Sequence, residues 1–113
     1  MKRTLLLAVI ALIMVSCGKE KIDEHPNFVG NWSGSDDLFR DYEITIEEDG
    51  SAYYYRLGIG YVERTGNFKV VSGGDKVKIA GKKMDINQYP TETDESEGLW
   101  EMQLDNIYLW TYK

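Results

Sequence analysis

Apolar and polar residues alternate along most of the chain from residue 28 to residue 113. A period of two residues is typical of β-strands that bury one face and expose the other. In the clearest case, Tyr42, Ile44 and Ile46 alternate with charged and polar neighbours. The spacing of apolar residues that marks an amphipathic helix is nearly missing from this part of the sequence. The pattern therefore predicts an all-β domain over residues 28–113.

Turn-forming residues divide this domain into about eight short strands. Asp49-Gly50 is a strong hairpin signal, and Asp105-Asn106 marks another turn between two alternating stretches. No segment is long enough to supply a crossover helix, so neighbouring strands are expected to pair antiparallel. Closure of such a sheet removes exposed strand edges. We therefore predict a small eight-stranded antiparallel meander barrel, with a flattened barrel or a two-sheet β-sandwich as the alternative.

Two residues inside the expected strands lead to more specific predictions. Gly66 lies within the long alternating stretch Tyr61–Val71, where a glycine indicates a bulge. Pro90 cannot donate a backbone hydrogen bond, so it is expected to end the strand before it. The polar segment Thr91–Gly98, which holds four acidic residues, is then expected to be a solvated loop rather than a calcium site.

The N-terminal segment has the organisation of a secretory signal peptide. Two basic residues precede the apolar run Leu5–Val15, which is too short to span a bilayer as a permanent helix. The end of this run, Val15-Ser16-Cys17-Gly18, resembles a bacterial lipobox. The resemblance implies cleavage before Cys17 and a covalent diacylglycerol lipid on that residue, which is the only cysteine of the chain. Residues 1–16 are therefore expected to be a lipoprotein signal peptide.

Residues 17–27 are charged and nearly devoid of apolar side chains, so they are expected to form a lipidated tether. Gly18 occupies the place of the Asp that retains enteric lipoproteins in the inner membrane. The charges after it resemble the export signals of Bacteroidetes surface lipoproteins. These features predict a cell-envelope protein that the lipid attaches to the outer membrane, on either the periplasmic or the surface face. The membrane is thus one expected partner.

Acidic residues outnumber basic ones in this chain. The formal net charge is −6, and it becomes −8 if Lys2 and Arg3 are removed with the signal peptide. Proteins bind phosphate backbones through basic side chains. We therefore expect no nucleic-acid partner.

Residues that usually perform nucleophilic or acid–base chemistry are scarce. His25, the only histidine, falls in the expected tether, and Cys17 would carry lipid rather than act as a nucleophile. No cluster of His, Cys and acidic residues has metal-ligand spacing. Paired acids such as Asp36-Asp37 have the context of turns, although a carboxylate-based hydrolase would use two of them across a cleft. We expect no enzyme activity, no metal site and no cofactor apart from the covalent lipid.

Over residues 28–113 the sequence resembles the lipocalin-like lipoproteins of Bacteroidetes. The resemblance is carried by Gly30-x-Trp32 on the first strand and by the Asp49-Gly50 hairpin with tyrosines after it. It implies an eight-stranded calycin-type barrel, a binding role, and structural roles for Gly30 and Trp32, with the indole packed at the closed end. Larger lipocalins have longer strands and usually a helix after the barrel. Any cavity in this chain is therefore expected to be smaller.

The domain holds more aromatic residues than one small core can bury. The residues expected to face inward are Tyr42, Tyr54, Trp100 and Leu109. The outward-facing candidates for binding a ligand or partner are Tyr53, Tyr55, Tyr108, Trp110 and Tyr112. The predicted function is non-catalytic binding of a small apolar molecule, a glycan or a protein. The alternative is a structural or interaction protein, or an inhibitor, that has a filled barrel and acts through its outer surface.

Overall fold

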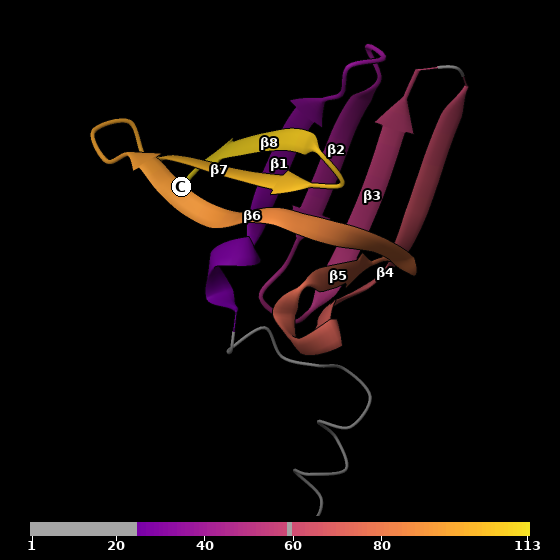
Figure 1. The fold of residues 1–113 in the computed structure, drawn as a ribbon, viewed down its shortest axis with the longest axis horizontal. Coiled ribbons are helices and arrows are strands. Elements are labelled where there is room, and N and C mark those ends of the chain that lie inside the picture. The colour runs from indigo at the N-terminus through magenta and orange to yellow at the C-terminus, as the bar shows by residue number, and fades with distance from the viewer. Residues whose placement is uncertain (1–24, 59) are drawn as a thin grey trace, which may run out of the picture.

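The computed structural model describes residues 25–58 and 60–113, which form a closed barrel of eight antiparallel strands (Figure 1). The strands pair in the order of the chain, and the last strand also pairs with the first. The predicted antiparallel meander barrel is therefore confirmed. The expected signal peptide, the lipidated Cys17 and most of the expected tether lie outside the described residues.

Each strand coincides with an alternating stretch of the sequence. The strands are β1 (Gly30–Ser35), β2 (Asp41–Ile46), β3 (Ser51–Leu57), β4 (Tyr61–Val71), β5 (Lys76–Ile79), β6 (Lys82–Asp94), β7 (Leu99–Leu104) and β8 (Ile107–Tyr112). Two short 3-10 segments accompany them, η2 (Pro26–Phe28) before β1 and η3 (Ser72–Gly74) before β5. In Figure 1, β6, β7 and β8 run across β1, β2 and β3. The apolar core lies between these two halves.

The connections explain why neighbouring strands form hairpins. Asp105 and Asn106 have positive φ angles of 50° and 63°, as both central residues of a type I′ turn require. Between β2 and β3, Gly50 has a φ of 88°, and its N–H donates to the Glu47 carbonyl at 3.0 Å. The connection is the four residues 47–50, with glycine in the left-handed position. Both predicted hairpins are confirmed.

The barrel closes through a short seam between β1 and β8. Ser33, Gly34 and Ser35 are the residues of β1 that pair with β8. A Cβ on Gly34 would lie 2.1 Å from the Tyr108 carbonyl oxygen, so this glycine allows the two backbones to meet. Gly30 has a different neighbour, because a Cβ there would lie 3.3 Å from the Trp32 indole nitrogen.

The expected bulge at Gly66 is wrong. The register between β3 and β4 is continuous over the whole pairing. A glycine is needed here for a different reason. A Cβ on Gly66 would lie 2.9 Å from the Cα of Ala80, which is too close. Gly66 therefore admits the backbone of the β5–β6 turn.

The expected strand end at Pro90 is also wrong. β6 continues to Asp94, so the segment Thr91–Gly98 is half strand and half turn. The register between β6 and β7 shifts between Gln88 and Thr91. Pro90 lies in this irregular stretch, where its missing N–H removes no regular ladder bond.

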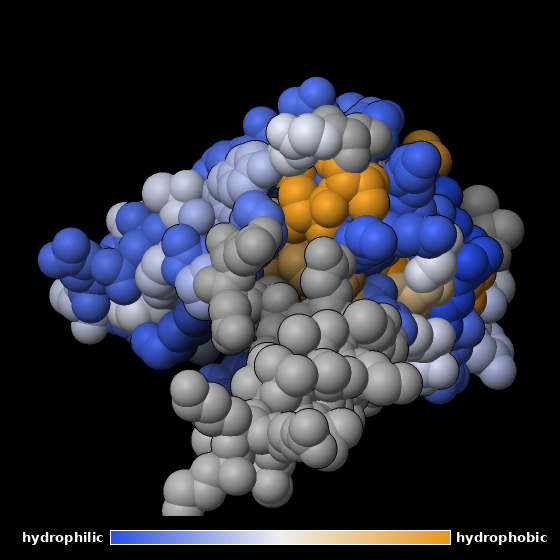
Figure 2. Space-filling view, turned by 90° about the horizontal axis from the view of Figure 1, so that it is seen from below, coloured by the Kyte–Doolittle hydropathy of each residue, from blue (hydrophilic) through white to orange (hydrophobic). Residues whose placement is uncertain are grey.

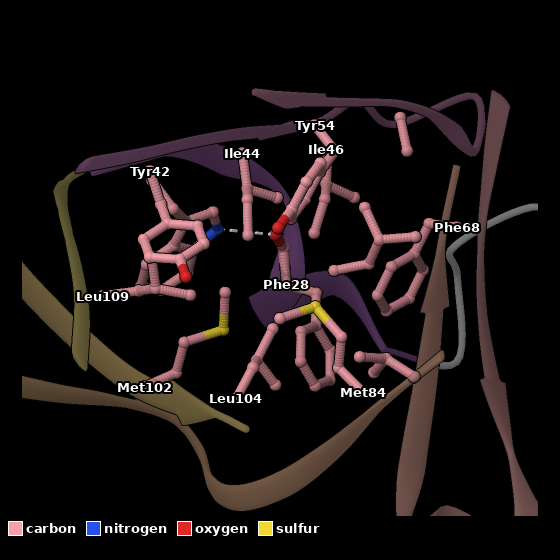
Figure 3. Packing of buried hydrophobic residues seen from close by; sticks show 14 of the residues in the cluster. Phe28, Tyr42, Ile44, Ile46, Tyr54, Phe68, Met84, Met102, Leu104 and Leu109 are labelled. Atoms are coloured by element: carbon pink, nitrogen blue, oxygen red, sulfur yellow. Dashed lines mark hydrogen bonds between the residues drawn. The ribbon is translucent and has the colours of Figure 1, made fainter. Parts of the chain in front are cut away.

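Sixteen buried apolar residues from the described part of the chain form the core. Figure 3 shows Ile44 and Ile46 of one half of the barrel pointing toward Met102 and Leu104 of the other. Burying one large apolar side chain contributes roughly 1.5–3 kcal/mol. These sixteen side chains fill the barrel interior over much of its length, as in the filled-barrel alternative.

One end of the barrel is closed by η2. Phe28 is buried, and its ring centre lies 4.9 Å from that of Phe68. The fully buried Trp32 donates from Nε1 to the Phe28 carbonyl at 2.8 Å, the contact dashed in Figure 3. The Lys113 ammonium lies 5.4 Å from the centre of the Trp32 ring and donates to the Asn27 carbonyl at 2.7 Å. Trp32 therefore packs at the closed end, as expected.

Two residues that the sequence assigned to the tether lie in a described 3-10 segment of the domain. Pro26 and Asn27 belong to η2 and contact the barrel, so they are not part of a tether. Seen from below, the uncovered surface is mostly hydrophilic, with apolar residues most visible near its centre and smaller apolar areas toward the right (Figure 2).

Candidate functional site

A pocket of about 400 Å³ opens at the end of the barrel opposite η2. It lies where β1 connects to β2, β5 to β6 and β7 to β8, and its volume is typical of small-ligand sites. Its apolar and aromatic lining residues are Leu38, Tyr42, Tyr54 and Ile107. Its charged lining residues are Asp36, Asp37, Arg40, Arg56, Lys82 and Asp105.

Asp36 organises the β1–β2 connection, which forms one wall of the pocket. Its carboxylate accepts hydrogen bonds from the Leu38 N–H at 2.9 Å, from Arg40 Nε at 2.6 Å and from the Tyr42 hydroxyl at 2.7 Å. Desolvation works to raise the pKa of Asp36, but the bonds from Tyr42 and Arg40 outweigh it and hold that pKa well below its usual range. Burial, together with the bond to Asp36, raises the pKa of Tyr42 to about 12. This wall is therefore fixed before any ligand arrives.

Three cations occupy core-facing positions at this end of the barrel. Arg56 follows the buried Tyr54 by two residues along β3, so it continues the same inward-facing row. Arg64 is the partner of Tyr54 on β4 and shares its face. A Cβ on Gly81 would lie 3.9 Å from Arg64 Nη1, which places this guanidinium beside the β5–β6 turn. The Lys82 ammonium lies 5.6 Å from the centre of the Tyr54 ring.

Arg56 has no partner for its charge among the described residues. Within the described residues the ion pairs are Arg40–Asp36 and Lys76–Asp85, so no carboxylate there lies within ion-pair distance of Arg56. Its buried Nε also has no hydrogen-bond partner in that part of the chain. A buried donor left unsatisfied costs about 1–3 kcal/mol, and such groups are uncommon in native proteins. The pocket wall thus holds a cation whose hydrogen-bonding capacity is unused.

The strand next to the pocket strand β3 has one unpaired edge. β5 pairs with Phe68–Val71 of β4, so the preceding segment Tyr61–Gly66 pairs with β3 alone. Figure 1 shows this part of the β3–β4 hairpin standing clear of β5. Arg64 lies within the segment and is exposed. Arg64, the β4 partner of the pocket residue Tyr54, is therefore accessible to solvent.

The β7–β8 turn forms another part of the rim. The Asp105 N–H donates to the Asp85 carbonyl at 2.9 Å, and Asp105 Oδ1 accepts from the Asp85 N–H at 2.7 Å. The Asn106 N–H donates to Asn87 Oδ1 at 2.6 Å. These bonds fasten the turn to β6, so both loop walls of the pocket are held by hydrogen bonds.

The five aromatic residues selected from the sequence lie on the outer face, away from the pocket. Tyr108, Trp110 and Tyr112 of β8 are 42%, 40% and 60% exposed, whereas Tyr53 and Tyr55 of β3 are half-buried. β1 and β2 lie between the two groups. The structure therefore does not bring the five residues together, and their role in binding stays a prediction.

Each outer group has its own local contacts. The rings of Trp110 and Tyr112 meet edge to face, with centres 5.8 Å apart. A hydrogen bond from the Tyr108 hydroxyl to Glu101, helped by desolvation, raises the pKa of Tyr108 to about 12. Desolvation and the nearby Glu63 raise the pKa of Tyr53. These tyrosines are therefore held against the sheet as protonated donors.

The acidic and histidine residues do not form a metal centre in the described part of the chain. No group of three or more His, Cys, Asp and Glu side chains is arranged to hold an ion there. His25 lies beside Phe28, with ring centres 6.3 Å apart, at the end opposite the pocket. Among the same residues, no helix is long and apolar enough to cross a membrane.

Sequence reasoning placed Tyr42 and Tyr54 inside the barrel but missed the inward-facing arginines, although the sequence contains a signal for them. One face of β3 carries Ala52, Tyr54 and Arg56 at alternate positions, and the first two of these residues are buried. When a charged residue stands at the next position of an alternating apolar row, its side chain is expected to face the core. Arg64 shows the same feature on β4, in phase with the buried Phe68.

No family model, curated protein or solved structure matches this chain. The lipocalin-like identity therefore stays a prediction.

Proposed function

We propose that this protein is a lipid-anchored binding protein of the cell envelope, and that its barrel takes a small molecule into the open-end pocket without catalysis. The observation that carries the proposal is the pocket of about 400 Å³, whose walls are strands and hydrogen-bonded turns. Preformed walls reduce the entropy that binding costs. The anchor is supported by the lipobox pattern that ends at Cys17.

The lining favours a ligand with both an apolar and a polar part. Tyr42 and Ile107 offer apolar surface, while Arg56 and Lys82 offer charge. The packed core below the pocket leaves the ligand at the mouth of the barrel rather than along its axis. A wholly apolar ligand would leave Arg56 desolvated and unpaired.

Native mass spectrometry of the full chain, purified from the cells that produce it, tests this proposal. We expect an adduct of a few hundred daltons, the size that such pockets enclose. Leu38→Trp adds bulk at the mouth without changing charge, so it should lower the bound fraction. Leu57→Trp adds the same bulk to an exposed leucine outside the pocket lining and should not. A bare polypeptide mass, or equal adducts in both variants, would contradict the proposal.

A second candidate function, binding of a protein or glycan through the outer face, is favoured by the exposed aromatic group on β8. Trp110 and Tyr112 present adjacent, partly exposed rings, a common feature of recognition surfaces. Trp110→Ala discriminates the two functions. It should leave the small-molecule adduct unchanged under the first proposal and abolish partner binding under the second.

A further inference from the structure

The charge of the open end differs from that of the whole molecule. The pocket lining carries equal numbers of acidic and basic side chains, and Arg64 adds a cation beside it. The whole chain has a net charge of −6. The pocket is therefore a locally basic site on an acidic protein.

The acids at the pocket are not equally free to neutralise these cations. Asp36 is engaged by Arg40 and Tyr42. Asp105 accepts a hydrogen bond from the Asp85 N–H. Asp37 is exposed to solvent, where its charge is screened. Neither Arg56 nor Lys82 has a carboxylate within ion-pair distance in the described residues.

The cations converge on one buried aromatic side chain. Tyr54 is 1% exposed, pairs with Arg64 across the sheet and lies under the Lys82 ammonium. Arg56 is two residues away on the same face of β3. Burial raises the pKa of Tyr54, so its hydroxyl stays protonated and remains a donor. Several cationic donors and a phenol around one point are suited to a compact anion.

We propose that the pocket binds a small organic acid, with its anionic group between Arg56, Arg64 and Lys82 and its apolar part against Leu38 and Ile107. This inference rests on the proposed function of the pocket and names its ligand class. An arginine guanidinium binds a carboxylate with planar, charge-assisted hydrogen bonds. The acid supplies the partner that Arg56 lacks among the described residues.

Calorimetric titration with two matched probes tests this inference. The full chain, reconstituted in phosphatidylcholine nanodiscs, is titrated with 2-naphthoate and with 2-naphthamide, which have the same ring but differ in charge. We expect naphthoate to bind at least tenfold more tightly, the ratio typical of one charge-assisted contact. Arg56→Gln should remove most of that preference while leaving the affinity for naphthamide unchanged.

Two further variants provide a control for the charge change and a second readout. Lys69→Gln removes the same charge from an exposed position on β4 and should leave both affinities unchanged. Arg64→Gln changes an exposed side chain and should also weaken naphthoate, which provides a readout if Arg56→Gln does not fold. Equal binding of both probes, or a preference that survives both arginine variants, would overturn the organic-acid inference and leave pocket binding standing. Binding of neither probe would overturn both.

Discussion

Asp36 shows how one carboxylate holds the β1–β2 wall of the pocket. Its pKa lies below the usual range because hydrogen bonds from Tyr42 and Arg40 outweigh desolvation. A carboxyl with a lowered pKa stabilises the fold fully above the unfolded value of about 3.9, and this contribution is lost as pH falls toward the folded pKa. The stability of the barrel should therefore decline below about pH 4 in part through Asp36.

Asp36→Asn tests this dependence. We expect a lower urea midpoint than wild type at pH 7 and a difference that shrinks as pH falls below about 4, because the Asp36 carboxyl of wild type then takes up a proton in the unfolded state but not in the folded state. Tryptophan fluorescence measures both unfolding curves. Asp37→Asn removes a charge from an exposed neighbour in the same loop and should change the midpoint little. A difference for Asp36→Asn that is constant with pH would contradict the assignment.

At the scale of elements, the closure of the barrel depends on the short contact between β1 and β8. A methyl group on Gly34 would lie 2.1 Å from the Tyr108 carbonyl oxygen and 2.9 Å from the Leu109 side chain. The backbone at Tyr108 cannot move aside for this methyl group as easily as a flexible side chain could. Gly34→Ala should therefore separate these strands and destabilise the protein by about 2 kcal/mol.

Chemical unfolding and hydrogen exchange measure this effect. We expect the amides of Ser33–Ser35 and of their β8 partners to exchange faster in Gly34→Ala. Ser35→Ala, at the next and exposed position, should change stability by less than about 0.5 kcal/mol. Full protection of the seam in Gly34→Ala would show that the strands tolerate the methyl group.

The elements were the part of the structure most accessible to prediction. Alternation such as that of Tyr42, Ile44 and Ile46 depends only on local sequence, and it located all eight strands. The prediction that Pro90 ends its strand was wrong because the hydrogen bond lost at a proline depends on the pairing with β7. That pairing has a register shift at this point, which the sequence of one strand does not reveal. The pocket was missed for a similar reason. Arg56 and Lys82 lie on β3 and β6, and only closure of the sheet brings them to one pocket.

For the whole molecule, the two ends of the barrel have different roles. η2 and Lys113 close one end, and the pocket opens at the other. Because the described chain enters at the closed end, a lipid on Cys17 would hold that end toward the membrane. Residues 17–24 reach roughly 29 Å when fully extended. With such an anchor the pocket would lie on the side away from the lipid, where dissolved molecules are present, and this would suit a charged ligand better than a membrane lipid.

The anchor itself is tested by Cys17→Ala in the full chain. Stable attachment requires more than one acyl chain, and the lipobox pattern assigns these chains to the only cysteine. Wild type should incorporate radiolabelled palmitate and sediment with the outer membrane, whereas Cys17→Ala should lose the label and that sedimentation. Ser16→Ala keeps a small residue before the cysteine and should retain both. Palmitate incorporation by Cys17→Ala would show that the lipid is attached elsewhere. The proposed placement of the closed end toward the membrane would then lose its support.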